Sequence, residues 1–416
     1  MRSMHSRSCL AFPLAAAAFA WIGASPCAAM RAHDDPPASV PAATATVDAA
    51  AWAKRGDSAA DYSAQLSGRA VLIMHEGQVV YERYDHEWSA SKPHMLASGT
   101  KSFTGVTAMF AVQNGLLTLD ELACDTIIEW RDDPRKSKIT IRMLLNLSSG
   151  LDPGEDTIGS AGALRLRGRR LSGGDGEKAV DDKFAAAVAV EAINEPGKRF
   201  VYGPSHFFAL GELLQRKLEA RHEADPKFPQ TVMSYMQARI FEPLKINIAF
   251  FGKDAKGNPN LPGGCFLTAR EWAKFGEFVR LNGAVRKAAD GNADTLTQLL
   301  KPELLAQCFE PSKANRGYGL TWWLPGEAAT GGTSTSDADM PLRDRVRARA
   351  LRAEAEGLIK DSSGKNHRVY MAAGLGKQRL YVLPDQGLVI VRFAENAAEG
   401  RGFDNAEFLK RALGVE

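Results

Sequence analysis

The fold of this 416-residue chain can be worked out from one segment, Ala97-Ser98-Gly99-Thr100-Lys101-Ser102-Phe103-Thr104-Gly105. Within and after this segment, apolar residues recur at the spacing of a helix. They are Phe103, Val106, Met109 and Phe110. Asn114-Gly115 then supplies a helix stop. We therefore predict a buried helix that begins near Ser98 and places Lys101 one turn further on the same face.

A serine three residues before a lysine is a common pattern, and this chain contains it three times. Residues 89–92 are followed by Pro93, which pushes the preceding residue out of the α region, so this copy cannot occupy one helix turn. Residues 362–365 have the composition of a surface turn. The copy that starts at Ser98 lies at the beginning of a helical pattern, so we expect it to carry the chemistry.

Ser98 and Lys101 suit nucleophilic catalysis. A serine hydroxyl becomes a good nucleophile when a base removes its proton, and a lysine can be that base only in its neutral form. Burial at the positive N-terminus of a helix disfavours the ammonium, and the same helix start offers backbone N–H groups to an oxyanion. The alternative is a helix-capping serine followed by a lysine that faces solvent.

The N-terminus has the composition of a secretory leader, which we place at residues 1–29. Two arginines precede an apolar run over residues 9–24, and Cys27-Ala28-Ala29 resembles a cleavage site. We expect export to the periplasm as a soluble protein without a stable membrane span, and an uncleaved anchor is the alternative. Residues 30–48 are rich in Pro and Ala and are expected to be a disordered lead-in.

The composition argues against several binding functions. The formal charge is +3, and removing the leader with its two arginines and no acids leaves +1, so no nucleic-acid binding is expected. Beyond the leader the cysteines are Cys124, Cys265 and Cys308, a sparse odd set that predicts buried thiols, with a Cys265–Cys308 bridge as the alternative. The eight histidines form no ligand cluster with the cysteines, so we predict no metal, and the chemistry needs no cofactor.

Both ends of the chain contain β-hairpin patterns. The predicted strands are residues 68–74 and 78–84 near the N-terminus, and 379–383 and 388–392 near the C-terminus. A final helix is expected from about Asn405 to Leu413. Helical patterns dominate between the hairpins, for example after the capping box that runs from Thr268 to Glu271. We therefore expect one antiparallel sheet built from both chain ends and flanked by helices, with a helical domain inserted.

These patterns divide the chain into parts. We expect a sheet-containing α/β part over residues 49–125 and 310–416, and a helical part over residues 126–309. Residues 324–368 look like an insertion. The arginine-rich helix pattern that begins at Pro341 is either a solvated surface or a lid over the active site.

Several segments, in order along the chain, resemble motifs of the serine β-lactamase and penicillin-recognising family, especially its class C-like esterase and amidase branch. They are residues 97–105, 144–151, 200–211, 263–273, 318–323 and 374–378. The resemblance spans about residues 65–395 and implies the β-lactamase/transpeptidase-like α/β (α+β) fold. It also implies an acyl-enzyme on Ser98, with Lys101 and Tyr202 as the catalytic acid–base pair.

The chain departs from the family pattern at two positions. Tyr202 is present, but Pro204 occupies the place of the asparagine that contacts lysine and substrate in the family. Residues 371–374, Met-Ala-Ala-Gly, stand where the family has Lys-Thr-Gly or His-x-Gly before the last hairpin. Family members use that lysine to bind a substrate carboxylate, so the resemblance implies that this function is lost.

The matches and the departures together predict a secreted serine hydrolase that acts on a small-molecule carboxylic ester or linear amide through an acyl-Ser98 intermediate. Backbone N–H groups of Ser98, Ala373 and Gly374 are expected to hold the oxyanion. β-Lactamase or D,D-peptidase activity is the alternative within the family. A non-catalytic binding module on the same fold is the alternative of another class. The sequence makes no prediction of oligomeric state.

Overall fold

The protein is described from a computed structural model. The described residues are 48–154, 158, 165–166, 169–170, 180–289, 292–325, 367–395 and 402–415. The predicted leader, nearly all of the lead-in, most of the predicted insertion and the serine–lysine copy at 362–365 therefore lie outside the described residues. The described residues all belong to one compact unit.

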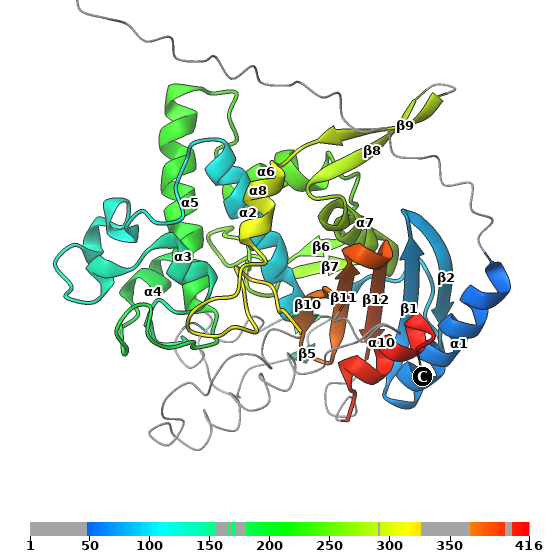
Figure 1. Ribbon diagram of the computed structural model, residues 1–416. Helices are drawn as coiled ribbons and strands as arrows, with labels where there is room; N and C mark the ends of the chain where they lie inside the picture. Colours follow the sequence, from blue (N-terminus) through cyan, green and yellow to red (C-terminus); the bar gives the residue numbers. More distant parts are fainter. Residues whose placement is uncertain are drawn as a thin grey trace, which may run out of the picture. The chain divides into compact units, whose positions relative to one another are not determined.

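Both ends of the chain build one antiparallel sheet, as predicted (Figure 1). Its strand order is β10-β11-β12-β1-β2. The strands are β1 (Gly68–His75), β2 (Gln78–Tyr84), β10 (Tyr370–Gly374), β11 (Gln378–Leu383) and β12 (Leu388–Ala394). In the pairing of β1 with β12, Ile73 lies opposite Ile390, so the two ends of the chain meet inside the sheet.

Different helices cover the two faces of this sheet. α1 (Ala49–Gln65) and α10 (Asn405–Leu413) pack together, and α1 contacts β1 and β2. α7 (Ala269–Arg280) packs on β11 and β12. Val389 contacts Gly276 of α7, whereas Arg392, three positions along the same strand, reaches α1. Because both faces are covered, β11 and β12 are buried along their whole length.

The remaining elements connect the two hairpins and include most of the helices. The α-helices are α2 (Lys101–Gln113), α3 (Ile141–Leu145), α4 (Lys183–Ala189), α5 (Ser205–Ala224), α6 (Val232–Met236) and α8 (Pro302–Gln307). Shorter turns are η1 (Ala97–Thr100), η2 (Ala123–Asp125), η3 (Ile128–Trp130), η4 (Lys136–Lys138), the π-helix η6 (Gln237–Phe241) and η9 (Pro384–Gln386). The short strands are β3 (His94–Met95), β4 (Arg165–Leu166), β5 (Arg169–Arg170), β6 (Phe250–Phe251), β7 (Cys265–Leu267), β8 (Ala284–Ala289) and β9 (Asn292–Gln298).

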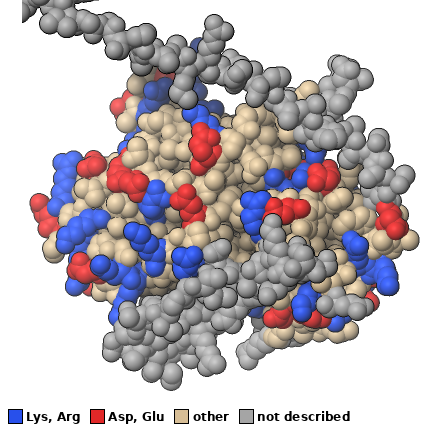
Figure 2. Space-filling model, in the orientation of Figure 1, with Lys and Arg blue, Asp and Glu red and all other residues tan. Residues whose placement is uncertain are grey.

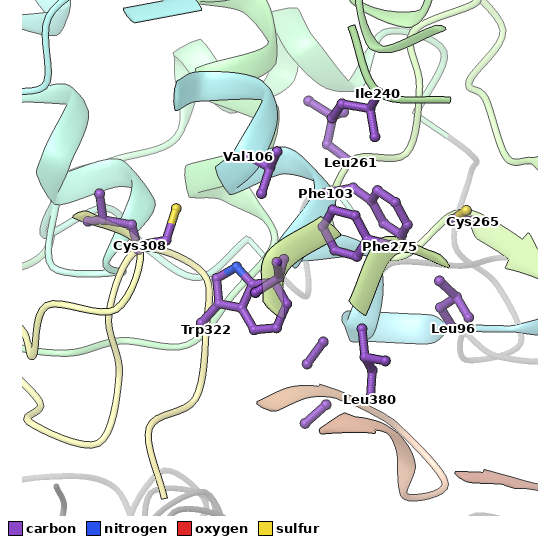
Figure 3. Close-up of a cluster of buried hydrophobic side chains, with 14 of the residues drawn as sticks. Leu96, Phe103, Val106, Ile240, Leu261, Cys265, Phe275, Cys308, Trp322 and Leu380 are labelled. Carbon is purple, nitrogen blue, oxygen red and sulfur yellow. The ribbon is translucent and has the colours of Figure 1, made fainter. Parts of the chain in front are cut away.

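The predicted buried helix is α2. Its residues from Lys101 through Ala111 are all buried, and Asn114 and Gly115 end it, with Gly115 at a φ of 67°. Figure 3 shows Phe103 of α2 against Phe275 of α7, whose ring centroids lie 3.9 Å apart in a stacked arrangement. α2 is therefore part of the core on every side.

Two local features differ from the sequence-based expectation. Thr268 caps α7 by accepting a hydrogen bond from the Glu271 N–H, but the reciprocal bond of a capping box is not formed. The Glu271 carboxylate instead accepts from the N–H of Asn247 and from Lys274. The antiparallel hairpin β8–β9 was not predicted, because its residues are mostly small, polar or charged and lack the apolar alternation of a strand.

The cysteines agree with the compositional prediction, and the surface in view carries charges of both signs. Figure 2 shows basic and acidic side chains interspersed over the face in view, without a basic patch among the coloured residues. Cys124, Cys265 and Cys308 are all buried free thiols, so the Cys265–Cys308 bridge is not formed. No helix within the described ranges has the length and apolarity needed to span a membrane.

Arg392 links the sheet to the end of α1, which leads to a stability prediction. Its guanidinium is buried and donates to the Ser63 hydroxyl at 2.8 Å, the Leu66 carbonyl at 2.8 Å and the Lys377 carbonyl at 2.9 Å. Arg392→Met removes these donors and leaves buried acceptors unsatisfied, so we expect a loss of roughly 3 kcal/mol in the free energy of unfolding, measured by urea denaturation.

The control for this measurement is Arg69→Met. Arg69 pairs with a Glu395 side chain that is 56% exposed, and exposed ion pairs contribute at most about 1 kcal/mol. Equal losses in the two variants would show that Arg392 is not a structural link.

Candidate active site

Ser98 and Lys101 lie together as the sequence predicts. η1 continues directly into α2, so the two side chains project from successive turns of one helical segment. Lys101 Nζ is 2.9 Å from Ser98 Oγ and donates a 2.8 Å hydrogen bond to the Pro262 carbonyl. Lys101 is 3% exposed, whereas Ser98 is only half-buried. A buried amine therefore contacts the hydroxyl of a half-buried serine.

The backbone before the nucleophile has an unusual conformation. Ala97 has a φ of 47°, in the left-handed region that residues with a side chain seldom occupy. The Gly99 N–H then donates to the Leu96 carbonyl at 3.0 Å and closes the turn that presents Ser98. Such strained residues cluster at functional sites, where the surrounding structure holds them in place.

A segment from the far side of the sequence fixes this helix start. Besides the lysine's bond to Pro262, Thr104 Oγ1 donates to the Leu261 carbonyl at 3.0 Å. The Cys265 N–H donates to Thr100 Oγ1 at 3.2 Å. These three hydrogen bonds join η1 and α2 to residues 261–265, which lead into β7 and α7.

Tyr202 joins the serine–lysine pair. Its ring centroid is 4.9 Å from Lys101 Nζ, and the ring of Phe207 lies 5.4 Å from the same nitrogen. Tyr202 also contacts Trp323, with ring centroids 6.0 Å apart. The structure thus brings together Ser98, Lys101 and Tyr202, the three residues that the sequence singled out.

The residues just after Tyr202 begin α5. Pro204 is the residue before the first helical position, and its carbonyl accepts hydrogen bonds from the helix N–H groups that follow. His206 is completely buried, and its Nδ1 lies 2.8 Å from Ser149 Oγ. Burial lowers the pKa of His206 from 6.5 to about 4, against a backbone hydrogen bond with Val201 that would raise it. His206 is therefore a neutral residue beneath the site.

The edge strand β10 lies beside the nucleophile. A Cβ added to Gly374 would stand 2.0 Å from the Leu96 carbonyl oxygen and 3.3 Å from the Ala97 Cβ, so only glycine fits this approach. On the outer edge of β10, Met371 exchanges two backbone hydrogen bonds with Trp323. Backbone N–H groups alternate in direction along a strand, so the N–H of Ala373 faces the same outer edge and that of Gly374 faces β11.

The sequence analysis did not identify two features of this site. They are the Pro262 carbonyl and the aromatic pair Tyr318 and Trp323. The Pro262 carbonyl has no side-chain signature, although it immediately precedes the Gly263-Gly264 pair of a recognised motif. Tyr318 and Trp323, from another recognised motif, pack with ring centroids 4.9 Å apart behind Tyr202. The described residues contain no group of His, Cys, Asp and Glu suited to a metal ion.

The fold and this site define a serine hydrolase of the penicillin-recognising type, and comparisons with known proteins agree. The beta-lactamase family model matches residues 47–413. The chain therefore belongs to the beta-lactamase family.

The chain is similar in sequence to an esterase and similar in fold to other hydrolases. Lovastatin esterase of Penicillium rubens is 30% identical over 178 residues, which are 38% of this chain and 39% of that protein. The matched segment thus spans about two fifths of this curated relative. The structure of EstCE1, a hydrolase with promiscuous acyltransferase activity, has a TM-score of 0.57 at 15% identity and covers 88% of this chain and 98% of its own. A D-stereospecific amidohydrolase from Streptomyces sp. has a TM-score of 0.56 at 16% identity, with coverages of 88% and 99%.

The buried neutral His206 predicts a pH dependence of stability. Unfolded chains bind a proton at a histidine below about pH 6.5, whereas the folded protein does so only below about pH 4. The free energy of unfolding should therefore fall as the pH is lowered through this window, by up to about 3 kcal/mol from this group. His206→Asn should remove part of that slope in denaturation curves recorded between pH 4 and 7.

His86→Asn is the matched control, because His86 is exposed and its surroundings change little on unfolding. Burial also lowers the pKa of His94 to about 4, so the slope should not vanish completely in His206→Asn. An unchanged slope in His206→Asn would contradict the buried neutral state of this histidine.

Proposed function

We propose that this chain is an exported hydrolase that cleaves uncharged carboxylic esters through an acyl intermediate on Ser98, with linear amides as second substrates. The observation that carries the proposal is the 2.9 Å approach of a buried Lys101 amine to the Ser98 hydroxyl. Retention of Tyr202 beside this pair favours an enzyme over a binding module that has kept only the fold. The leader-like composition of residues 1–29 supports export.

Acylation follows from this geometry. Burial disfavours the charged form of an amine, so Lys101 can accept the Ser98 proton while its own N–H remains bonded to the Pro262 carbonyl. The Ser98 oxygen then forms a bond to the substrate carbonyl carbon, and the carbonyl electron pair moves to oxygen. When the tetrahedral intermediate collapses, the ester C–O bond breaks. The alkoxide receives the proton through Lys101 or Tyr202 and leaves as an alcohol.

The oxyanion requires two N–H donors near Ser98. The first is the N–H of Ser98 itself, at the start of the η1–α2 segment where helix N–H groups have no helix partner. The second comes from the outer edge of β10. The alternation of the strand favours the N–H of Ala373 over that of Gly374 for this role.

Deacylation reuses the same groups. A water molecule gives a proton to the Lys101–Tyr202 pair and attacks the acyl carbon, and the proton returns to Ser98 as the ester bond to the enzyme breaks. Because the two groups lie close together, either one can carry the free-base role.

The side chains around the site favour a substrate without a carboxylate. β10 presents Met371, Ala372 and Ala373, all buried, where the family carries a cationic or imidazole side chain. Pro204 removes the amide of the family asparagine. Desolvating a carboxylate without a cationic partner costs several kcal/mol, so the described part of the site is better suited to a neutral ester than to a penicillin or cephalosporin.

Covalent labelling tests the nucleophile. A fluorophosphonate probe reacts with an activated serine and requires no knowledge of the substrate. We expect one label on Ser98 in the wild-type protein and none in Ser98→Ala, as measured by intact-protein and peptide mass spectrometry. Lys101→Met should slow labelling by roughly two to four orders of magnitude, because it removes the positioned base.

The control is Ser89→Ala, since Ser89 belongs to the exposed serine–lysine copy, where its hydroxyl lies 3.1 Å from that of Ser91. This variant should label at the wild-type rate. A label at any residue other than Ser98, or no label on a folded wild-type protein, would refute the proposed catalytic function and favour the binding module.

Substrate preference is tested by comparing kcat/KM for a short p-nitrophenyl ester and a chromogenic cephalosporin. The ester should be preferred, because its alkoxide leaves more readily than an amine and it carries no carboxylate to desolvate. Ser98→Ala measures the background hydrolysis of both compounds. A higher kcat/KM for the cephalosporin would instead assign a β-lactamase.

A further inference from the structure

Tyr318 carries a hydroxyl group that no hydrogen bond in the described part of the chain uses. Its side chain is completely buried, and within the described ranges its hydroxyl oxygen has no hydrogen-bond partner. Tyr235 is equally buried, but its hydroxyl donates to Asn114 Oδ1 at 2.6 Å. A buried hydroxyl without a partner lowers stability, and a phenylalanine would fill the same space without that loss. The packing of the described residues therefore does not explain the hydroxyl of Tyr318.

The position of Tyr318 connects it to the site. Its ring contacts Phe200 at 5.2 Å and Trp323 at 4.9 Å between centroids. Tyr202 contacts the same two rings, at 6.3 Å and 6.0 Å. The two tyrosines thus share one pair of aromatic neighbours, and Tyr202 is the one that reaches Lys101.

The loop that carries Tyr318 is held firmly. Tyr318 and Trp323 form a β-bridge, and the Gly319 N–H donates to the Trp322 carbonyl at 2.9 Å. Thr321, between them, has a φ of 74°, which is unusual for a β-branched residue. The strained residue Thr321 therefore belongs to the turn that brings Tyr318 and Trp323 into contact, and Trp323 in turn contacts Tyr202.

We infer that Tyr318 is a positioning residue that donates a hydrogen bond to the Tyr202 oxygen when Tyr202 gives up its proton during the reaction. This inference rests on the function proposed above for Ser98, Lys101 and Tyr202. Hydrogen bonds of catalytic groups are often long in the resting site and shorten when charge develops. A hydrogen bond from a neutral hydroxyl to a phenolate is stronger than one to a neutral phenol. The hydrogen bond from Tyr318 would therefore favour the phenolate form of Tyr202.

The raised pKa of Tyr318 agrees with Tyr318 as the hydrogen-bond donor and Tyr202 as the acceptor. Burial, and after it the phenol of Tyr202, raise the pKa of Tyr318 well above its usual value. Tyr318 therefore keeps its proton at every pH at which the enzyme would act, and it can donate that proton in a hydrogen bond to a Tyr202 oxygen that has lost its own. Because Tyr318 is completely buried, it acts through Tyr202 and not on the substrate.

Tyr318→Phe tests the inference, since it removes one oxygen atom and keeps every ring contact. We expect the melting temperature to stay the same or rise. The rate of fluorophosphonate labelling at Ser98 should fall by roughly 10- to 100-fold, as for the loss of a hydrogen bond to a charged group. The midpoint of the labelling rate against pH, recorded from pH 5 to 10, should move upward by about one unit.

Tyr235→Phe is the matched control, because it removes a buried hydroxyl that has a partner. It should lower the melting temperature and leave the labelling rate and its pH midpoint unchanged. An unchanged rate and midpoint in Tyr318→Phe, or a loss of stability like that of Tyr235→Phe, would overturn the role of Tyr318 alone. Absence of labelling in the wild-type protein would instead overturn the proposed function on which the inference rests.

Discussion

The rest of the structure depends on how the buried amine of Lys101 is satisfied. A lysine on a helix that is buried on every side needs hydrogen-bond acceptors within reach, because an unsatisfied buried amine is costly. Ser98 provides one partner from the same helix face, and the carbonyl of Pro262 provides another from a distant segment. That segment continues into β7 and α7. The contact between this segment and the helix that carries Lys101 therefore helps to place both Ser98 and α7, which packs on the sheet.

The second structural constraint is the β10 edge of the sheet, which other parts of the chain must cover. An exposed edge strand is open to unwanted pairing, and β10 is covered by Trp323 and by the turn that carries Ser98. Two buried guanidinium groups hold the turn after β10. Arg379 donates to the Gly374 carbonyl at 3.1 Å, and Arg392 donates to the Lys377 carbonyl at 2.9 Å. Fixed backbone amides stabilise an oxyanion well because they do not reorganise during the reaction.

Local sequence patterns predicted the elements, whereas long-range contacts account for what was missed. The terminal helix Asn405–Leu413 and the two hairpins follow from capping, turn and alternation signals a few residues long. Ser98, Lys101 and Tyr202 were singled out because ordered motifs reinforce one another, and the structure places the three side by side. Residue type did not predict the role of the Pro262 carbonyl or the left-handed conformation of Ala97, because every residue has the same backbone groups. They arise only when distant segments meet.

The departures from the family pattern fall where the fold tolerates them. Pro204 stands at the start of α5, where helix N–H groups have no helix partner, so a proline there removes no helix hydrogen bond. Ala372 and Ala373 fill buried positions on β10 without needing a partner for a charge. Neither change touches the hydrogen bonds that hold Lys101 between Ser98 and Pro262. Residues beside the site can thus be exchanged while Ser98 and Lys101 stay fixed by the core, so the fold is kept while the surroundings of the site change.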